Sequence, residues 1–293
     1  LIEKIDNNQV VPSDYQTMLD NFNKNAELNK EAYQDFSGLF NDINLGDSRL
    51  GNSTIARAKA LNAIAKLVNS VQYKGEDGKD ILGEIYEYLI GQFAASAGKK
   101  GGVFYTPHQV SKILAKLVTH NVAPSKQAFA VYDPAMGSGS LLLTVRGELP
   151  GGDKEGAITF YGQELNTTTY NLARMNLMMH GLDNPSIDYL DTLSQEYNNE
   201  VDCQYDIVMA NPPFTGNIDK SDIDENLKLP TTKTELLFVE RIFNMLKIGG
   251  SAGIIIPQGV LFGSGKAFVE ARKKLVEECE LKAVITMPSG VFK

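Results

Sequence analysis

The first third of the chain has apolar residues at helical spacing. They recur every three or four positions over residues 53–71 and again over residues 81–95, which predicts two amphipathic helices. Asn52 or Ser53 would cap the first of these helices. The pattern therefore predicts a helical N-terminal domain over residues 1–98.

After a glycine-rich joint at residues 96–102, short apolar runs alternate with helical segments. The runs predict strands over residues 128–132, 158–162, 187–190, 206–210, 252–256 and 281–287. Helices are predicted between most of them, over residues 110–118, 141–146, 168–180, 235–246 and 266–278. This alternation predicts an α/β domain over residues 99–293 with a doubly wound, mostly parallel, Rossmann-like sheet. Ligands of such a sheet bind at the carboxyl ends of its strands.

Composition and charge narrow the class of protein. No apolar run approaches the roughly 18 residues that span a bilayer, and the first residues lack a signal-peptide pattern, so we expect a cytoplasmic protein without a membrane contact. The formal net charge is -8, which argues against a chain that grips DNA phosphates over a wide surface unaided. A partner would then carry the basic surface, while Lys99 and Lys100 form either a small basic patch or a solvated turn.

Cysteine and histidine are too scattered to predict a disulfide or a metal site. Cys203 and Cys279 are far apart, and neither belongs to a cluster with metal-binding spacing. The histidines at positions 108, 120 and 180 lie too far apart for a local ligand motif.

The first predicted strand runs into a glycine turn that opens a helix. The turn reads Asp133-Pro134-Ala135-Met136-Gly137-Ser138-Gly139-Ser140. Its glycines can bring bare backbone and helix N-terminal N–H groups against a ligand, which predicts a cofactor site. The alternative is an ordinary structural turn, since turns use glycine freely. No lysine follows it as in a phosphate-binding P-loop.

Acidic residues stand at the ends of the second and third predicted strands. Glu164 follows the glycine turn by about 25 residues, near the spacing at which a carboxylate accepts ribose hydroxyls. Asp191 could accept from the amino group of a cofactor's adenine, or it could cap a turn.

The fourth predicted strand runs into the most specific feature of the sequence, Asn211-Pro212-Pro213-Phe214. The residue before a proline is held extended, so the prolines make the backbone rigid. The Asn211 side chain and the Pro212 carbonyl could then accept both N–H bonds of an aromatic amine, which frees its lone pair to attack a methyl group. Phe214 would stack on a target base that has left its helix. The alternative is a proline-stiffened loop with a buried phenylalanine.

A further motif precedes the helix predicted over residues 110–118. Thr106 would cap that helix, with Pro107 in its first turn. Phe104 and Tyr105 are adjacent aromatic residues after glycines, and such a pair suits a wall against a ligand.

Taken together and in this order, these motifs resemble those of the amino-methylating adenine DNA methyltransferases of the gamma class. The resemblance is strongest to the modification subunit of type I restriction-modification systems, and it extends over essentially the whole chain. Segments at residues 227–235 and 256–262 are similar to later parts of that subunit. Two departures are Met136, where the family commonly has cysteine, and Leu190, where it often has a smaller residue.

The resemblance implies a site-specific adenine DNA methyltransferase that uses S-adenosylmethionine. The cofactor-binding residues that it implies are Phe104, Tyr105, Thr106, Pro107, Asp133, Pro134, Gly137, Ser138, Gly139, Ser140, Glu164 and Asp191. The first four would contact the methionine part, the glycine turn the methionine and sugar, Glu164 the ribose and Asp191 the cofactor adenine. The target adenine would be held for direct, in-line methyl transfer by the catalytic residues Asn211, Pro212, Pro213 and Phe214.

The resemblance also implies partners. Two modification subunits and one DNA-specificity subunit form a complex on double-stranded DNA, to which a restriction subunit can add. The sequence stops at Lys293, directly after a predicted strand, so we expect a domain that is truncated at its C-terminal end and cannot assemble normally in this form. The DNA sequence that is methylated would be read by the partner.

Three other functions stay open. A nicotinamide-dependent dehydrogenase would also use a glycine turn and a strand-end acid, but it leaves residues 211–214 unexplained, and the turn lacks the third glycine of GxGxxG. An amino-methyltransferase acting on RNA or protein would use the same residues. A scaffold that binds the cofactor without catalysing transfer would share the cofactor site alone.

Overall fold

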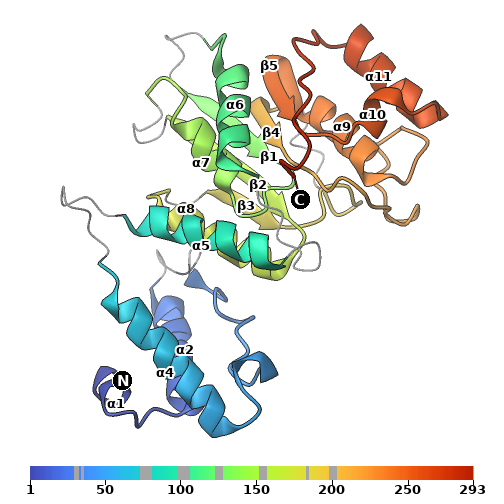
Figure 1. The fold of residues 1–293 in the computed structure, drawn as a ribbon. Helices are drawn as coiled ribbons and strands as arrows, with labels where there is room; N and C mark the ends of the chain where they lie inside the picture. Colours follow the sequence, from blue (N-terminus) through green and yellow to red (C-terminus); the bar gives the residue numbers. More distant parts are fainter. Residues whose placement is uncertain are drawn as a thin grey trace. The chain divides into compact units, whose positions relative to one another are not determined.

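The computed structural model describes residues 1–29, 33, 36–72, 81–97, 106–122, 128–151, 157–182, 185–197 and 203–292 (Figure 1). The chain divides into two compact units, Leu1–Tyr86 and Glu87–Lys293, and the division falls inside helix α5 (Leu82–Ala97). The domain boundary predicted between residues 98 and 99 lies outside the described residues. None of the described helices is long and apolar enough to cross a membrane.

The first unit is helical, as predicted. It contains α1 (Ile2–Asp6), α2 (Pro12–Leu28), the short 3-10 helix η1 (Ser48–Leu50), α4 (Thr54–Ser70) and the start of α5. The Ser53 side chain caps α4 by accepting from the backbone N–H of Ala56 at 3.1 Å. The hydroxyl of Tyr15 on α2 donates to the buried side chain of Asn62 on α4 at 3.4 Å, which links these two helices.

The second unit holds a five-stranded sheet in which every pair of neighbouring strands is parallel (Figure 1). The strands are β1 (Phe129–Asp133), β2 (Ile158–Glu164), β3 (Ser186–Tyr189), β4 (Tyr205–Ala210) and β5 (Leu246–Ile254). Their order in the sheet is β3-β2-β1-β4-β5. Strands β2 and β3 therefore lie on one side of β1, and β4 and β5 lie on its other side. The predicted doubly wound sheet is confirmed, and its switch point lies between β1 and β4, where such folds bind ligands.

Helices cover both faces of this sheet. The helices that follow α5 are α6 (His108–Thr119), α7 (Ser140–Arg146), α8 (Thr167–Met179), α9 (Thr234–Met245), α10 (Gly259–Phe262) and α11 (Lys266–Glu277), of which α11 packs against α9 and α10. Val131 of β1 and Met209 of β4 are buried in a core cluster with side chains of α6, α7 and α8. Tyr132 and Val208, the alternate residues of the same strands, are buried in a cluster with α9. The alternating side chains therefore build two cores, which hold the strand ends rigidly.

Helix α6 lies close against β5, and a glycine makes this approach possible. A Cβ atom on Gly253 would lie 2.7 Å from Leu114 Cδ1 and 2.9 Å from Val118 Cγ1, both on α6. Any larger residue would force these side chains or the helix to move. Gly253 thus sets how near the middle and the last turn of α6 come to β5.

One predicted strand is wrong. Residues 281–287 form neither a strand nor a helix, and Leu281, Val284 and Ile285 are each more than half exposed. The apolar pattern was sufficient for a strand, but a strand also needs a neighbouring edge with which to pair its backbone groups. No described strand pairs with this segment.

We predict that Gly253→Ala lowers the free energy of unfolding by about 1–3 kcal/mol, because the added methyl group overpacks the contact between α6 and β5. Gly259→Ala is the matched control, since a Cβ there meets nothing within 4 Å. Guanidinium unfolding of both variants measures the difference. Equal midpoints for the two variants would contradict the close contact.

Candidate active site

Four of the predicted site residues lie at or just after the carboxyl ends of four neighbouring strands. Asp133 and Glu164 are the last residues of β1 and β2, and Asp191 and Asn211 come shortly after β3 and β4. Because the strands are parallel, their carboxyl ends lie along one edge of the sheet. The structure therefore brings these four sequence-predicted residues to the same edge.

The glycine turn after β1 has the backbone that only glycine adopts easily. Gly137 and Gly139 have φ values of 55° and 77°, and Gly139 is the N-cap residue of α7. Met136 is buried and packs over Gly162 of β2. A Cβ atom on Gly162 would lie 2.7 Å from the sulfur of Met136. The turn is thus held closely against β2, and a Cβ atom on Gly139 would come 3.2 Å from Leu177 Cδ2 of α8.

Further hydrogen bonds brace this turn. The backbone N–H of Met136 donates to Gln163 O at 3.0 Å, and the side chain of Asn176 donates to Ser138 O at 2.9 Å. The hydroxyls of Ser138 and Ser140, both buried, lie 3.0 Å apart. Serine and glycine therefore form a preorganised loop rather than a loose connection.

Asp133 is buried with one unsatisfied oxygen. Its Oδ1 accepts from the backbone N–H of Ala135 at 3.0 Å, while Oδ2 has no hydrogen-bond partner among the described residues. The pKa of this carboxyl is raised to about 8, mainly by burial; the Ala135 bond lowers it, and the nearby Glu164 carboxylate raises it. A ligand that brings a positive charge or an N–H or O–H donor would satisfy this oxygen.

Glu164 joins β2 to the glycine turn. Its Oε2 accepts from the backbone N–H of Gly137 at 3.1 Å, and its Oε1 accepts from that of Asn166 at 2.8 Å. Burial raises the pKa of Glu164, and these backbone bonds oppose the rise. Each carboxylate oxygen can accept more than one hydrogen bond, so the side chain can still receive ligand hydroxyls.

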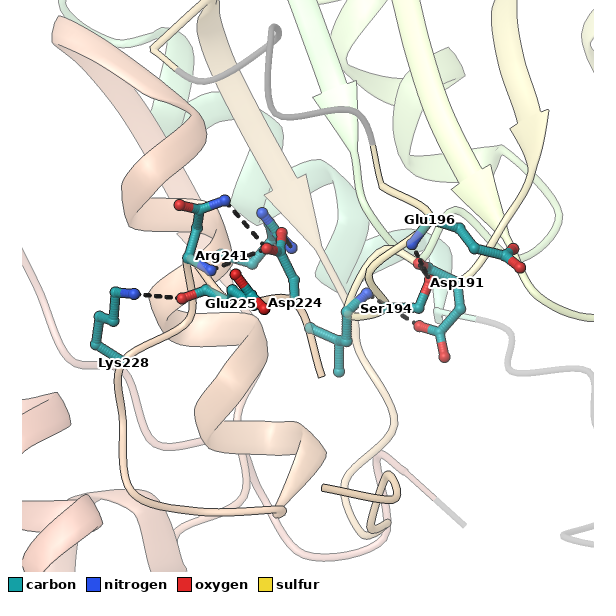
Figure 2. Close-up of polar contacts among 9 residues, drawn as sticks. Asp191, Ser194, Glu196, Asp224, Glu225, Lys228 and Arg241 are labelled. Carbon is teal, nitrogen blue, oxygen red and sulfur yellow. Dashed lines mark hydrogen bonds and ion pairs between the residues drawn. The ribbon is translucent and has the colours of Figure 1, made fainter. Parts of the chain in front are cut away.

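Asp191 caps a turn, which is one of the two roles that the sequence left open. Its Oδ1 accepts from the backbone N–H of Leu193 at 3.0 Å, and its backbone oxygen accepts from the hydroxyl of Ser194 at 2.9 Å (Figure 2). The neighbouring Thr192, which no sequence motif singled out, is buried and donates to Pro134 O at 2.6 Å. The loop after β3 is therefore fastened to the glycine turn.

A second loop, residues 215–233, is fastened to the loop after β3. Asp224 donates its backbone N–H to Leu193 O at 2.9 Å, and its side chain forms a buried ion pair with Arg241 of α9 (Figure 2). The Arg241 guanidinium lies 4.2 Å from the ring centroid of Tyr197. No sequence motif marks this pair, but it anchors the segment that follows Phe214 to a buried helix.

Asn211 presents an unsatisfied acceptor at the end of β4. Its Nδ2 donates to Thr106 Oγ1 at 3.0 Å, whereas its Oδ1 is buried and has no partner in the part of the chain that the structure describes. The strand end beside it is fixed, because Ile255 N–H donates to Ala210 O at 2.9 Å. Such a free oxygen is suited to accept an N–H from a ligand.

Phe214 lies three residues after Asn211 and is half-buried. The ring of Phe292, which the sequence did not single out, packs against it edge to face, with 5.4 Å between centroids and an interplanar angle of 87°. The Phe214 ring is therefore held in position by an aromatic neighbour from a remote part of the chain.

The cap predicted for α6 is wrong. The N-cap residue is Pro107, and no side chain caps the helix. The hydroxyl of Thr106 instead accepts from Asn211, the residue that follows β4. Phe104 and Tyr105 lie outside the described residues.

Comparisons with known proteins identify the family of the chain. A family model described as N-6 DNA Methylase matches residues 77–293. The chain is 33% identical to the MpnII methylase subunit of a type I restriction enzyme from Mycoplasma pneumoniae, over 98% of this chain and 56% of that subunit.

Two solved structures share the fold. The methyltransferase subunit of a type I restriction-modification system from Streptococcus thermophilus matches with a TM-score of 0.77 and 32% identity, over 94% of this chain and 58% of that one. A Listeria monocytogenes protein assigned to the class I S-adenosylmethionine-dependent methyltransferases matches with a TM-score of 0.64 and 19% identity, over 94% and 82%. The chain spans about half the length of the curated relatives it matches.

We predict that Asp133 makes stability fall as the pH rises. The raised pKa keeps Asp133 protonated in the folded protein up to about pH 8, whereas in the unfolded chain it ionises near its ordinary value of 3.8. The folded state therefore binds more protons between these values, and the contribution of this group to stability is present below about pH 4 and lost toward pH 8. Guanidinium unfolding of Asp133→Asn should show a weaker pH dependence than the wild type. Asp219→Asn, at an exposed position, is the control. This account would be contradicted if Asp133→Asn left the pH dependence of the unfolding free energy unchanged, or if Asp219→Asn weakened it equally.

Proposed function

The chain belongs to the N-6 DNA methylase family, and from this we propose that it is the catalytic part of a type I restriction-modification methylase subunit. It transfers a methyl group from S-adenosylmethionine to the exocyclic amino group of adenine in DNA. The observation that carries the proposal is the buried Oδ1 of Asn211, which has no partner among the residues that the structure describes and lies at the sheet edge that also bears the glycine turn.

The site suits the cofactor. When bound, S-adenosylmethionine supplies an electrophilic methyl group on a positively charged sulfur, and it also carries an amino group with N–H donors. The positive charge of this ligand would favour the ionised form of Asp133, whose Oδ2 would then be a buried acceptor, and the absence of a side chain at Gly137 would help the ligand to approach the backbone. Glu164 would accept the ribose hydroxyls through its remaining lone pairs, and Asp191 would address the adenine.

The remaining cofactor contacts rest on the family resemblance. Phe104, Tyr105 and Pro107 would line the methionine part, while Pro134, Ser138 and Ser140 would complete the glycine turn around it. These assignments are proposals.

Asn211 and Pro212 would act on the target amine. The nitrogen lone pair of an aromatic amine is delocalised into the ring, which makes it a poor nucleophile. Hydrogen bonds from its two N–H groups to Asn211 Oδ1 and to the Pro212 carbonyl favour a pyramidal nitrogen with a localised lone pair. Because Asn211 Oδ1 is buried, water does not compete for this bond, and the interaction is stronger than at a surface.

Phe214 would hold the ring of the target base. A base inside a duplex cannot reach a pocket at the end of a strand, so it must be flipped out, and stacking on Phe214 offsets part of the unstacking cost. The edge-on contact of Phe292 keeps the Phe214 ring oriented for this stacking.

The partners follow from the family and from the charge. A formal charge of -8 leaves little capacity to grip DNA phosphates, so a DNA-specificity subunit would supply that surface. We place the chain in a cytoplasmic complex with that subunit, a second copy of the methylase subunit and, in the full enzyme, a restriction subunit. The helical N-terminal domain, proposed as residues 1–98, precedes the methyltransferase domain in this assembly.

Labelled methyl transfer tests the proposed function. The methylase complex, with its specificity subunit, is given S-adenosylmethionine with a labelled methyl group and either duplex DNA, RNA or protein. We expect label in DNA as N6-methyladenine. Label in RNA or protein alone would replace the proposal by another amino-methyltransferase, and binding of the cofactor without any product would leave a scaffold.

We predict that Asn211→Ala lowers the methyl-transfer rate by about a hundredfold to a thousandfold, because it removes an acceptor at the nucleophile. The affinity for S-adenosylmethionine should stay within about twofold in calorimetry, since the acceptors for the cofactor remain. Asn121→Ala, at an exposed position after α6, is the control that should change neither quantity. Loss of cofactor binding in Asn211→Ala would overturn the role given to this residue.

We predict that Phe214→Leu weakens productive binding of the target by about 1–3 kcal/mol, since it removes the aromatic surface on which the base stacks. Phe214→Tyr retains that surface and should stay near wild type. Fluorescence of 2-aminopurine at the target position reports the flipped base in both variants. Equal signals from Phe214→Leu and the wild type would argue against stacking on this ring.

A further inference from the structure

We propose that Thr106 is a positioning residue that fixes the side-chain amide of Asn211 in its reactive orientation. The proposal rests on the proposed function and adds a role for a side chain that the family resemblance connects only with the cofactor. It starts from one pair of observations. Asn211 Nδ2 donates to Thr106 Oγ1 at 3.0 Å, and Asn211 Oδ1, the other end of the same amide, is buried and has no partner within the described part of the chain.

The orientation of this amide decides whether Asn211 can act. The two ends of an asparagine amide have nearly the same shape, but one is an acceptor and the other a donor of two hydrogens. A target amine also brings two N–H donors. With Oδ1 toward the amine, a hydrogen bond forms, whereas with Nδ2 toward the amine, two donors face each other. A 180° rotation about the last side-chain bond therefore converts a productive site into a repulsive one.

Thr106 can select between these orientations because of what it offers to Nδ2. Thr106 as a residue is 7% exposed, so little water reaches the contact. While the target amine occupies Oδ1, only the orientation seen here satisfies both ends of the amide at once. Without the hydroxyl, Nδ2 would point at an apolar group and remain unsatisfied in the complex, which is costly for a buried donor.

The backbone around Thr106 is rigid enough for this task. Pro107 follows it and fixes the chain at the start of α6, where the Pro107 carbonyl accepts from the N–H groups of Val110 at 2.8 Å and Ser111 at 3.0 Å. Helix α6 is in turn held against β5 by the close contact at Gly253. The Thr106 hydroxyl is thus carried to the end of β4 by packing, although 105 positions separate it from Asn211 in the sequence.

A cofactor role and a positioning role for the Thr106 hydroxyl have opposite kinetic signatures. If the hydroxyl binds S-adenosylmethionine, its loss raises the Kd for the cofactor, and saturating cofactor restores the rate. If it orients Asn211, its loss leaves that Kd unchanged and lowers the rate of methyl transfer at saturating cofactor and DNA.

The experiment compares Thr106→Val, which has nearly the same shape without the hydroxyl, with Thr106→Ser, which retains it. The methylase complex with its specificity subunit is used throughout. Calorimetry gives the Kd for S-adenosylmethionine, and single-turnover transfer of labelled methyl gives the rate. We expect Thr106→Val to reduce the rate about tenfold to a hundredfold with a Kd within about twofold of wild type, and Thr106→Ser to restore most of the rate.

A double-mutant cycle with Asn211→Ala supplies the decisive comparison. Because Thr106 acts through Asn211, adding Thr106→Val to Asn211→Ala should cause no further loss of rate. An equal loss in both backgrounds, or a weakened Kd with a normal rate at saturation, would overturn the positioning role. Absence of DNA methylation by the wild-type complex would instead overturn the proposed function, and this outcome is seen before any variant is measured.

Discussion

Two buried oxygen atoms without hydrogen-bond partners are the constraint on which the second unit depends. Asp133 is the last residue of β1, and Asn211 follows the adjacent strand β4. Asp133 Oδ2 and Asn211 Oδ1 each lack a partner among the described residues. Leaving a buried polar atom unsatisfied costs about 1–3 kcal/mol, so the surrounding fold must compensate for both. The two apolar cores on opposite faces of the sheet supply that stability. A ligand that displaces the groups covering these oxygens would satisfy both of them with hydrogen bonds, and fixed polar groups of this kind are what methyl transfer to a poor nucleophile requires.

The loops at this edge are held by contacts between residues far apart in the sequence. Thr192 ties the loop after β3 to the glycine turn, and the buried pair of Asp224 and Arg241 anchors the segment after Phe214 to α9. Loops with such anchors keep their shape without a ligand, whereas unanchored loops pay an ordering cost when they bind. Within the described second unit, rigidity is thus concentrated where the proposed cofactor and the target base would meet.

Much of the fold and of the site was predictable, because local patterns determine them. The apolar runs gave the five strands of the sheet, and the glycine turn and Asn211-Pro212-Pro213-Phe214 have backbone requirements that are visible in the sequence itself. The failures are tertiary. Residues 281–287 have the pattern of a strand but no partner edge, and Thr106, which local rules make a helix cap, bonds to Asn211 across 105 positions. The need for glycine at position 253 likewise arises from α6, which packs on β5.

Binding of the cofactor is the most direct test of this account, since it requires the glycine turn, Asp133 and Glu164 together. S-adenosylmethionine and, separately, NAD are titrated into the protein in a calorimeter, and each is then tested as a competitor of the other. The account predicts saturable binding of S-adenosylmethionine with about one site per chain and no effect of NAD, as expected for a ligand that satisfies buried acceptors at a glycine turn. Saturable binding of NAD with none of S-adenosylmethionine would contradict it and would make the glycine turn that of a dehydrogenase.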